Sequence, residues 1–192
     1  MVKEFKLSKQ ERKLVSAGVQ EARILRIIDR GLRPADDRSK RKDPVQSLKI
    51  VFEVSQDKIN VDGIELPMTI SSKMTFNTNE KSTLNRLRVA AGLPESFTLD
   101  QLIGKPVSLT IAHKPLPDGT KYSAVAGIAG LSDMVAAMVP PLVAKSYIFD
   151  FDNPDAELLK TFSEYAITDL KDALNYQGSA LQKLIEQDEG IL

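Results

Sequence analysis

Residues 70–92 read ISSKMTFNTNEKSTLNRLRVAAG, and the spacing of the apolar residues changes inside this stretch. Before Thr78 the apolar side chains share one face of a period-two pattern, which is typical of a strand. This face comprises Met68, Ile70, Met74 and Phe76. Beyond Thr78 the period becomes that of a helix. The apolar stripe of this helix comprises Leu84, Leu87 and Ala91. Thr78 or Asn79 is the expected N-cap and Gly92 the expected end, so the pattern predicts a strand followed directly by a helix.

Strand patterns also occur on both sides of this stretch, where apolar and β-branched residues alternate with polar ones. Strands are expected in residues 19–29, 47–54, 105–113 and 122–131. Asp62 and Gly63 form a dipeptide typical of hairpins, so the strands before and after it are expected to pair. Residues 98–104 predict a second, short helical segment.

The predicted order is therefore three strands, a helix and two strands. This is the order of the OB-fold, a mainly β barrel with one helix between the third and fourth strands, which binds oligonucleotides across one face. Other small barrels usually lack a helix at that point, although several α+β folds contain similar elements. We predict an OB-fold domain in residues 18–131, preceded by an exposed arm of mixed charge in residues 1–17.

Residues 132–192 are predicted to form an acidic α-helical extension. The apolar run at residues 134–148 contains two prolines and is shorter than the roughly 20 residues that span a membrane, so we expect protein to bury it. Helical spacing continues over residues 155–176 and again over residues 179–187. The chain begins without the apolar run of a secretory signal, so we expect a cytoplasmic protein, in the host cytoplasm if it is viral.

The formal net charge is zero, with 26 basic and 26 acidic residues, but the charges are unevenly distributed. Residues 1–131 carry 22 basic and 15 acidic side chains, a net charge of +7. Residues 132–192 carry 4 basic and 11 acidic ones, a net charge of −7. Such asymmetry indicates electrostatic binding to a partner.

Motifs for catalysis, metal binding and phosphate loops are missing from the sequence. There is no cysteine, His113 is the only histidine, and neither GxSxG, GxxxxGK[ST] nor GxGxxG occurs. His113 continues the alternation of the fourth strand, which explains it without catalysis. The segment DFDNPD at residues 150–155 has the acidic spacing of a calcium loop, but it lacks the glycine and the final glutamate of an EF-hand. A turn and a helix cap explain it, so we expect no enzyme, no metal and no cofactor.

Basic residues are the strongest remaining signal, and we expect them to form one continuous positive surface over the first three strands, the loop after the first strand and the helix. The candidate DNA-binding residues are Arg23, Arg26, Arg30, Arg33, Arg38, Lys40, Arg41, Lys42, Lys49, Lys73, Lys81, Arg86 and Arg88, with the aromatic residues Phe76 and Tyr122 to stack bases. Phe52 is a further aromatic candidate. The alternative is a solvated loop whose arginines pair with nearby acids.

Four short motifs occur in an order and spacing known from one protein family. Asp29 and Gly31 close the first strand, Ser72–Thr75 reads SKMT, Glu80–Leu84 reads EKSTL, and Leu102–Pro106 reads LIGKP. Over about residues 18–131 the chain thereby resembles small bacteriophage proteins thought to be OB-fold single-stranded DNA-binding proteins. It departs from them at residues 88–91, where the family commonly has an aromatic residue, and in its enlarged loop at residues 33–42.

The resemblance implies a sequence-nonspecific single-stranded DNA-binding protein of phage replication or recombination, with RNA as the other ligand of this class. The acidic end would recruit replication or recombination proteins, or compete for the DNA groove. The residues expected to do this are Glu186, Asp188, Glu189, Ile191 and Leu192. The alternative is a phage structural or adaptor protein with the barrel as a scaffold. Residues 134–148 and 155–176 would then form a homo-oligomer surface, and the basic loop would face an acidic partner.

Overall fold

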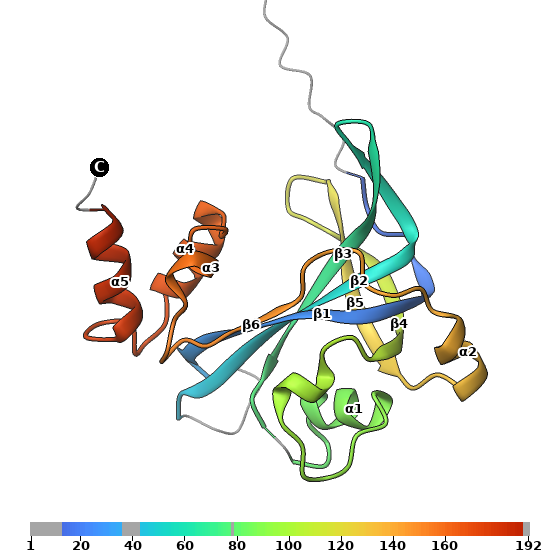
Figure 1. Cartoon of the computed structure of the whole chain (residues 1–192), viewed down its shortest axis with the longest axis horizontal. Helices are drawn as coiled ribbons and strands as arrows, with labels where there is room; N and C mark the ends of the chain where they lie inside the picture. The colour runs from blue at the N-terminus through green and yellow to red at the C-terminus, as the bar shows by residue number, and fades with distance from the viewer. Residues whose placement is uncertain (1–12, 36–42, 78, 190–192) are drawn as a thin grey trace, which may run out of the picture.

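A curled antiparallel sheet dominates the computed structural model, which describes residues 13–35, 43–77 and 79–189 (Figure 1). Within these residues the sheet follows the path β3-β2-β1-β4-β5. The strands of this path are β1 (Gly18–Arg33), β2 (Val45–Val61), β3 (Ile64–Thr75), β4 (Pro106–Pro115) and β5 (Lys121–Ala129). Its two end strands, β3 and β5, contact each other, so the sheet curls into a half-barrel. The protein is therefore mainly β, as the alternation predicted.

The turn between β2 and β3 confirms the predicted hairpin. Val61 pairs with Ile64, and the two residues between them have positive φ, 51° at Asp62 and 87° at Gly63. Positive φ at both central residues is the geometry that Asp-Gly turns favour in hairpins. The Asn60 side-chain oxygen accepts a hydrogen bond from the Gly63 N–H at 2.9 Å and closes the turn.

Strand β1 has two different partners on the side away from β2. Residues 18–23 pair with β4, whereas residues 26–28 pair in parallel with the short strand β6 (Tyr147–Phe149). The register of β1 against β2 shifts between Ile24 and Arg26, where the change of partner occurs. The second half of β1 therefore joins the barrel to the C-terminal third of the chain.

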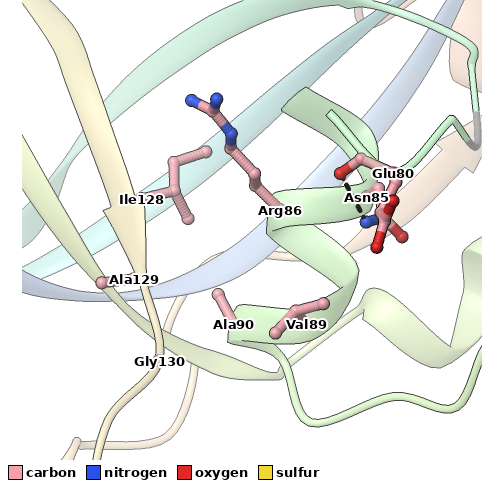
Figure 2. A pocket seen from close by; sticks show the side chains of 8 residues that line it. All are labelled: Glu80, Asn85, Arg86, Val89, Ala90, Ile128, Ala129 and Gly130. Atoms are coloured by element: carbon pink, nitrogen blue, oxygen red, sulfur yellow. Dashed lines mark hydrogen bonds between the residues drawn. The ribbon is translucent and has the colours of Figure 1, made fainter. Parts of the chain in front are cut away.

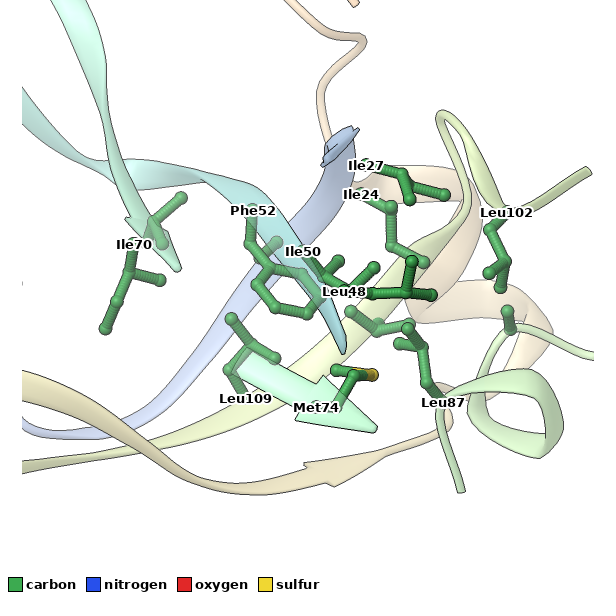
Figure 3. Close-up of a cluster of buried hydrophobic side chains, with 14 of the residues drawn as sticks. Ile24, Ile27, Leu48, Ile50, Phe52, Ile70, Met74, Leu87, Leu102 and Leu109 are labelled. Atoms are coloured by element: carbon green, nitrogen blue, oxygen red, sulfur yellow. The ribbon is translucent and has the colours of Figure 1, made fainter. Parts of the chain in front are cut away.

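The concave side of the sheet holds the first hydrophobic core (Figure 3). The alternating apolar residues of two strands that the sequence predicted are all buried there. They are Leu48, Ile50, Phe52 and Val54 of β2, and Val107, Leu109 and Ile111 of β4. Helix α1 (Thr83–Ala90) and the 3-10 helix η1 (Leu99–Leu102) cover one end of this core with Leu84, Leu87 and Leu102.

Helix α1 begins later than the sequence predicted. Ser82 is its N-cap, and the Ser82 hydroxyl accepts a hydrogen bond from the Asn85 N–H at 3.0 Å. Asn79, one of the two expected caps, instead accepts a backbone bond from Ser82 in a preceding turn, and Thr78 lies outside the described residues. The chain thus completes a turn after β3 before the helix starts.

A second core lies on the other side of β1 and β2. Leu25 and Ile28 of β1 and Val51 of β2 pack there against residues from the last third of the chain. That third contains α2 (Asp133–Met138), α3 (Ala156–Leu159), α4 (Glu164–Lys171) and α5 (Ala180–Glu189). Its buried residues are Phe149, Phe151, Leu159, Leu170, Ala173, Tyr176, Leu181 and Ile185. We call residues 139–185 the C-terminal cover.

The single helix expected over residues 155–176 is wrong, because α3 and α4 occupy that range as two short helices. Ser163 separates them, since its hydroxyl accepts a hydrogen bond from the Ala166 N–H at 3.3 Å and caps α4. The helices seen in the described part of the chain are all too short or too polar to cross a membrane.

Candidate nucleic-acid interface

Four basic side chains from three neighbouring strands gather on the side of the sheet that carries the second core. They are Arg30 and Arg33 of β1, Lys49 of β2 and Lys73 of β3, and we call them the basic cluster. Lys49 and Lys73 are direct cross-strand partners. Like charges placed directly opposite each other destabilise a sheet, so this pair needs an anion nearby.

Asp169 of α4 supplies that anion. The Arg30 guanidinium donates two hydrogen bonds to the Asp169 carboxylate, from Nε and Nη2, both at 2.7 Å. The Lys73 ammonium donates a third at 3.0 Å, and Arg33 donates to the Asp169 backbone carbonyl. Arg30 is only 7% exposed and also donates from Nη1 to the Ser47 hydroxyl at 2.8 Å. The carboxylate thus lies inside the basic cluster.

The pKa values in the cluster follow from burial and charge. Burial alone would raise the pKa of Asp169, but the hydrogen bonds and charges of Arg30 and Lys73 outweigh it and hold this pKa well below its ordinary value. Burial lowers the pKa of Lys49, with Asp169 opposing the shift and neighbouring Lys73 adding to it. The Arg33 pKa is also lowered, first by burial and then by Arg30. An anion therefore stabilises charges that would otherwise repel one another.

Arg23 and Arg26 bind backbone carbonyls, those of Gly104 and of three residues of the C-terminal cover. Arg23 donates at 2.7 Å to the carbonyls of Gly104, Val139 and Pro140. Arg26 donates to the Lys145 carbonyl at 3.2 Å, and its guanidinium lies 4.9 Å from the centre of the Tyr147 ring, a cation–π contact. These two arginines are therefore engaged within the protein.

A second group of the predicted residues lies around α1. Lys81 and Arg86 are exposed, and Phe76, just after β3, is 47% exposed. Arg86 lines an open groove between α1 and the end of β5, where Val89 and Ile128 form the apolar walls (Figure 2).

Arg88 and Tyr122 lie apart from this groove. Arg88 is tied down by bonds from Nε to the Asn85 side chain at 2.9 Å and from Nη1 to the Leu93 carbonyl at 2.8 Å. Tyr122 is 41% exposed on β5, opposite Lys114. Phe52, the third aromatic candidate, is fully buried in the first core. Among the described residues, the predicted single surface is therefore divided into the partly covered basic cluster and an open group around α1.

Several predicted residues have no described side chain. Arg38, Lys40, Arg41 and Lys42 lie outside the described residues, as do Ile191 and Leu192. Asp188 and Glu189 belong to α5, but only their backbone is described. Glu186 is exposed on α5 and accepts a hydrogen bond from the Gln182 side chain at 2.8 Å.

Residues considered for catalysis or calcium make structural contacts within the described part of the chain. His113 Nε2 lies 2.8 Å from the Val15 carbonyl. Asp150 accepts from the backbone N–H groups of Asp152 and Asn153 at 2.9 and 3.2 Å, and Asp155 caps α3 through the Leu158 N–H at 3.0 Å. These bonds are those of a turn followed by a helix cap.

Sequence patterns do not identify two acidic residues that are important to this surface. Asp169 is described above, and Glu53 of β2 is 4% exposed and binds the backbone N–H groups of Val143 and Ala144 at 2.8 and 2.9 Å. Arg30 lies 139 residues and Lys73 96 residues from Asp169, and Val143 lies 90 residues from Glu53, so no local spacing indicates these contacts. One signal was present, because Leu25, Ile28 and Val51 are apolar on the face opposite the first core. Strands that are apolar on both faces are typical of sheets that are covered on both sides.

No family model matches the sequence, and no curated protein matches it.

Proposed function

We propose that this protein has an OB-fold and binds single-stranded DNA without sequence preference, in phage DNA replication or recombination. The path β3-β2-β1-β4-β5, with α1 between β3 and β4 and with β3 facing β5, supports the OB-fold part of the proposal. An OB-fold binds oligonucleotides on the face of its second and third strands and on the loops after the first and fourth.

The basic cluster is the observation that carries the binding part of the proposal. It joins β1, β2 and β3 on the convex side, which is the side that OB-folds use. Arg30 has the planar guanidinium fork that binds two oxygens of one anion, a carboxylate here and a phosphate in the proposed complex. Phe76 and Tyr122 are exposed and offer ring faces for bases.

Binding of this kind depends on salt. If the four cations of the cluster each neutralise one phosphate, log affinity falls by about 3 for each tenfold rise in salt, at about 0.7 per contact on a single strand. Stacking on aromatic rings tolerates any base, so little sequence preference is expected. The acidic end with Glu186 is then free to recruit replication or recombination proteins.

Fluorescence anisotropy with labelled oligo(dT), beside a duplex of the same length, tests the proposal. The full chain is expected to bind the single strand more tightly than the duplex at low salt. Lys73→Gln should weaken binding and reduce the salt slope by about 0.7, the share of one phosphate contact. Lys58→Gln is the matched control, because Lys58 is exposed near the hairpin tip, away from the cluster.

Absence of single-strand binding at low salt, or equal affinity for the duplex, contradicts the proposal. That outcome favours the adaptor alternative, for which light scattering measures self-association. The exposed Met134 and Met138 of α2 are the residues to change in that case.

A further inference from the structure

Asp169 makes the contacts that a phosphate group would make in the basic cluster. Its two carboxylate oxygens receive three charge-assisted hydrogen bonds, two from Arg30 at 2.7 Å and one from Lys73 at 3.0 Å. Its side chain is 16% exposed, so solvent reaches the site only in part. A ligand phosphate and the Asp169 carboxylate cannot occupy these donors together.

The cluster retains positive charge while Asp169 is bound. Two carboxylates, Asp169 and Asp172, interact electrostatically with Arg33. The cluster contains four cations, so the positive charges outnumber these two negative ones. Lys73 remains 49% exposed at the edge of the site. A polyanion can therefore approach Lys73 first and then compete for Arg30.

Helix α4 contacts the barrel chiefly near and beyond its C-terminal end, at Asp169, Leu170 and Leu174. Only Leu170 of α4 is fully buried, and beyond its end the Leu174 N–H donates to the Leu32 carbonyl at 2.9 Å. The rest of the C-terminal cover is bound separately, through Glu53 and through the pairing of β6 with β1. Movement of α4 alone thus uncovers the cluster while β6 stays in the sheet.

We propose that Asp169 is a built-in competitor for phosphate, and that a single-stranded nucleic acid displaces α4 when it occupies the basic cluster. This inference rests on the proposed function and adds the regulation of its site. When the site is open in only a fraction of the molecules, the measured association constant is the intrinsic constant multiplied by that fraction. If that fraction is about one in ten, removal of the competing charge tightens binding about tenfold.

Asp169→Asn in the full chain tests this, with Glu164→Gln as the matched control. Both changes remove one negative charge from α4, but Glu164 is exposed in its first turn. Asp169→Asn should tighten oligo(dT) binding about tenfold at low salt, whereas Glu164→Gln should change it less than twofold. Unchanged or weaker binding by a folded Asp169→Asn protein overturns the proposal.

Hydrogen exchange on the unchanged protein gives a test that does not depend on how the variant folds. Saturating oligo(dT) should raise exchange at the Leu174 amide, which bonds to the Leu32 carbonyl of β1, and leave the amides of β4 unchanged. Equal or stronger protection at Leu174, with the single strand bound, overturns displacement while the proposed function stands. If no form of the protein binds the single strand, the proposed function itself fails.

Discussion

Glu53→Gln is expected to loosen the C-terminal cover from the barrel. The Glu53 carboxylate is almost fully buried and accepts hydrogen bonds from the Val143 and Ala144 N–H groups, at 2.8 and 2.9 Å. A glutamine keeps one acceptor oxygen but turns an NH₂ group toward the other N–H. The substitution therefore places two hydrogen-bond donors, the side-chain NH₂ and a backbone N–H, against each other in a buried site.

The magnitude follows from these two bonds. A hydrogen bond to a charged group contributes about 1.5–3 kcal/mol, and an unsatisfied buried donor costs about 1–3 kcal/mol. We expect Glu53→Gln to lower the free energy of unfolding by about 2–4 kcal/mol. Urea denaturation at neutral pH, followed by circular dichroism and extrapolated to zero denaturant, measures it.

Glu65→Gln is the matched control for this experiment. Glu65 lies on β3, its side chain is 69% exposed, and its nearest charged partner is Lys58 at 3.8 Å. An exposed pair of this kind contributes at most about 1 kcal/mol. If Glu53→Gln and Glu65→Gln differ by less than about 1 kcal/mol, the anchoring role given to Glu53 is wrong.

Three further changes test the same packing. Gly31→Ala should destabilise the protein by about 2–5 kcal/mol in urea denaturation. The φ of Gly31 is +71°, and an added Cβ would lie 2.7 Å from the Asn175 side chain and 2.9 Å from Phe151. Gly119→Ala is the control, because its φ is +80° but an added Cβ has no neighbour within 4 Å, so only the smaller backbone cost is expected. Burial raises the pKa of Asp29, so the folded protein binds this proton more tightly than the unfolded chain does. The folded protein therefore loses stability as pH rises above about 4, the pKa of an aspartate in the unfolded chain. Asp29→Asn should therefore be at least as stable as the parent at pH 7, and a clear loss there would contradict this account. The pKa of Asp169 is lowered in the folded protein, so its contribution to stability is present above about pH 4 and is lost as pH falls further. Between pH 2 and 5 the free energy of unfolding should therefore depend less on pH for Asp169→Asn than for the parent.

Local periodicity was sufficient to predict strands β1 to β5 and the hairpin, but not β6, which lies in the region expected to be helical. Phe52 and Leu109 lie inward because every second residue of a strand points to the same face, and Asp62-Gly63 turns because both residues accept positive φ. The start of α1 was less predictable, because Thr78, Asn79 and Ser82 are all residues that cap helices. The turn that precedes Ser82 selects among them, and propensity alone does not contain it.

The exposure of the basic residues could not be predicted from local pattern. Arg23 and Arg30 share no sequence feature that separates them from the exposed Lys81 and Arg86. What separates them is the C-terminal cover, whose contacts reach Arg23 from Pro140 and Arg30 from Asp169. Contacts between residues more than 100 positions apart depend on the completed fold.

The uneven charge along the sequence predicted an electrostatic partner, and part of that partner is the same chain. The segment with net charge −7 supplies Asp169 to the basic cluster of the segment with net charge +7. Arg23 and Arg26 are satisfied by neutral carbonyls of the same segment, so packing uses their hydrogen-bond donors without cancelling their charge. The positive potential of the barrel is consequently reduced but not removed. In the proposed complex a polyanion replaces a carboxylate already in position, and its affinity reflects the difference between its interaction free energy with the basic cluster and that of Asp169.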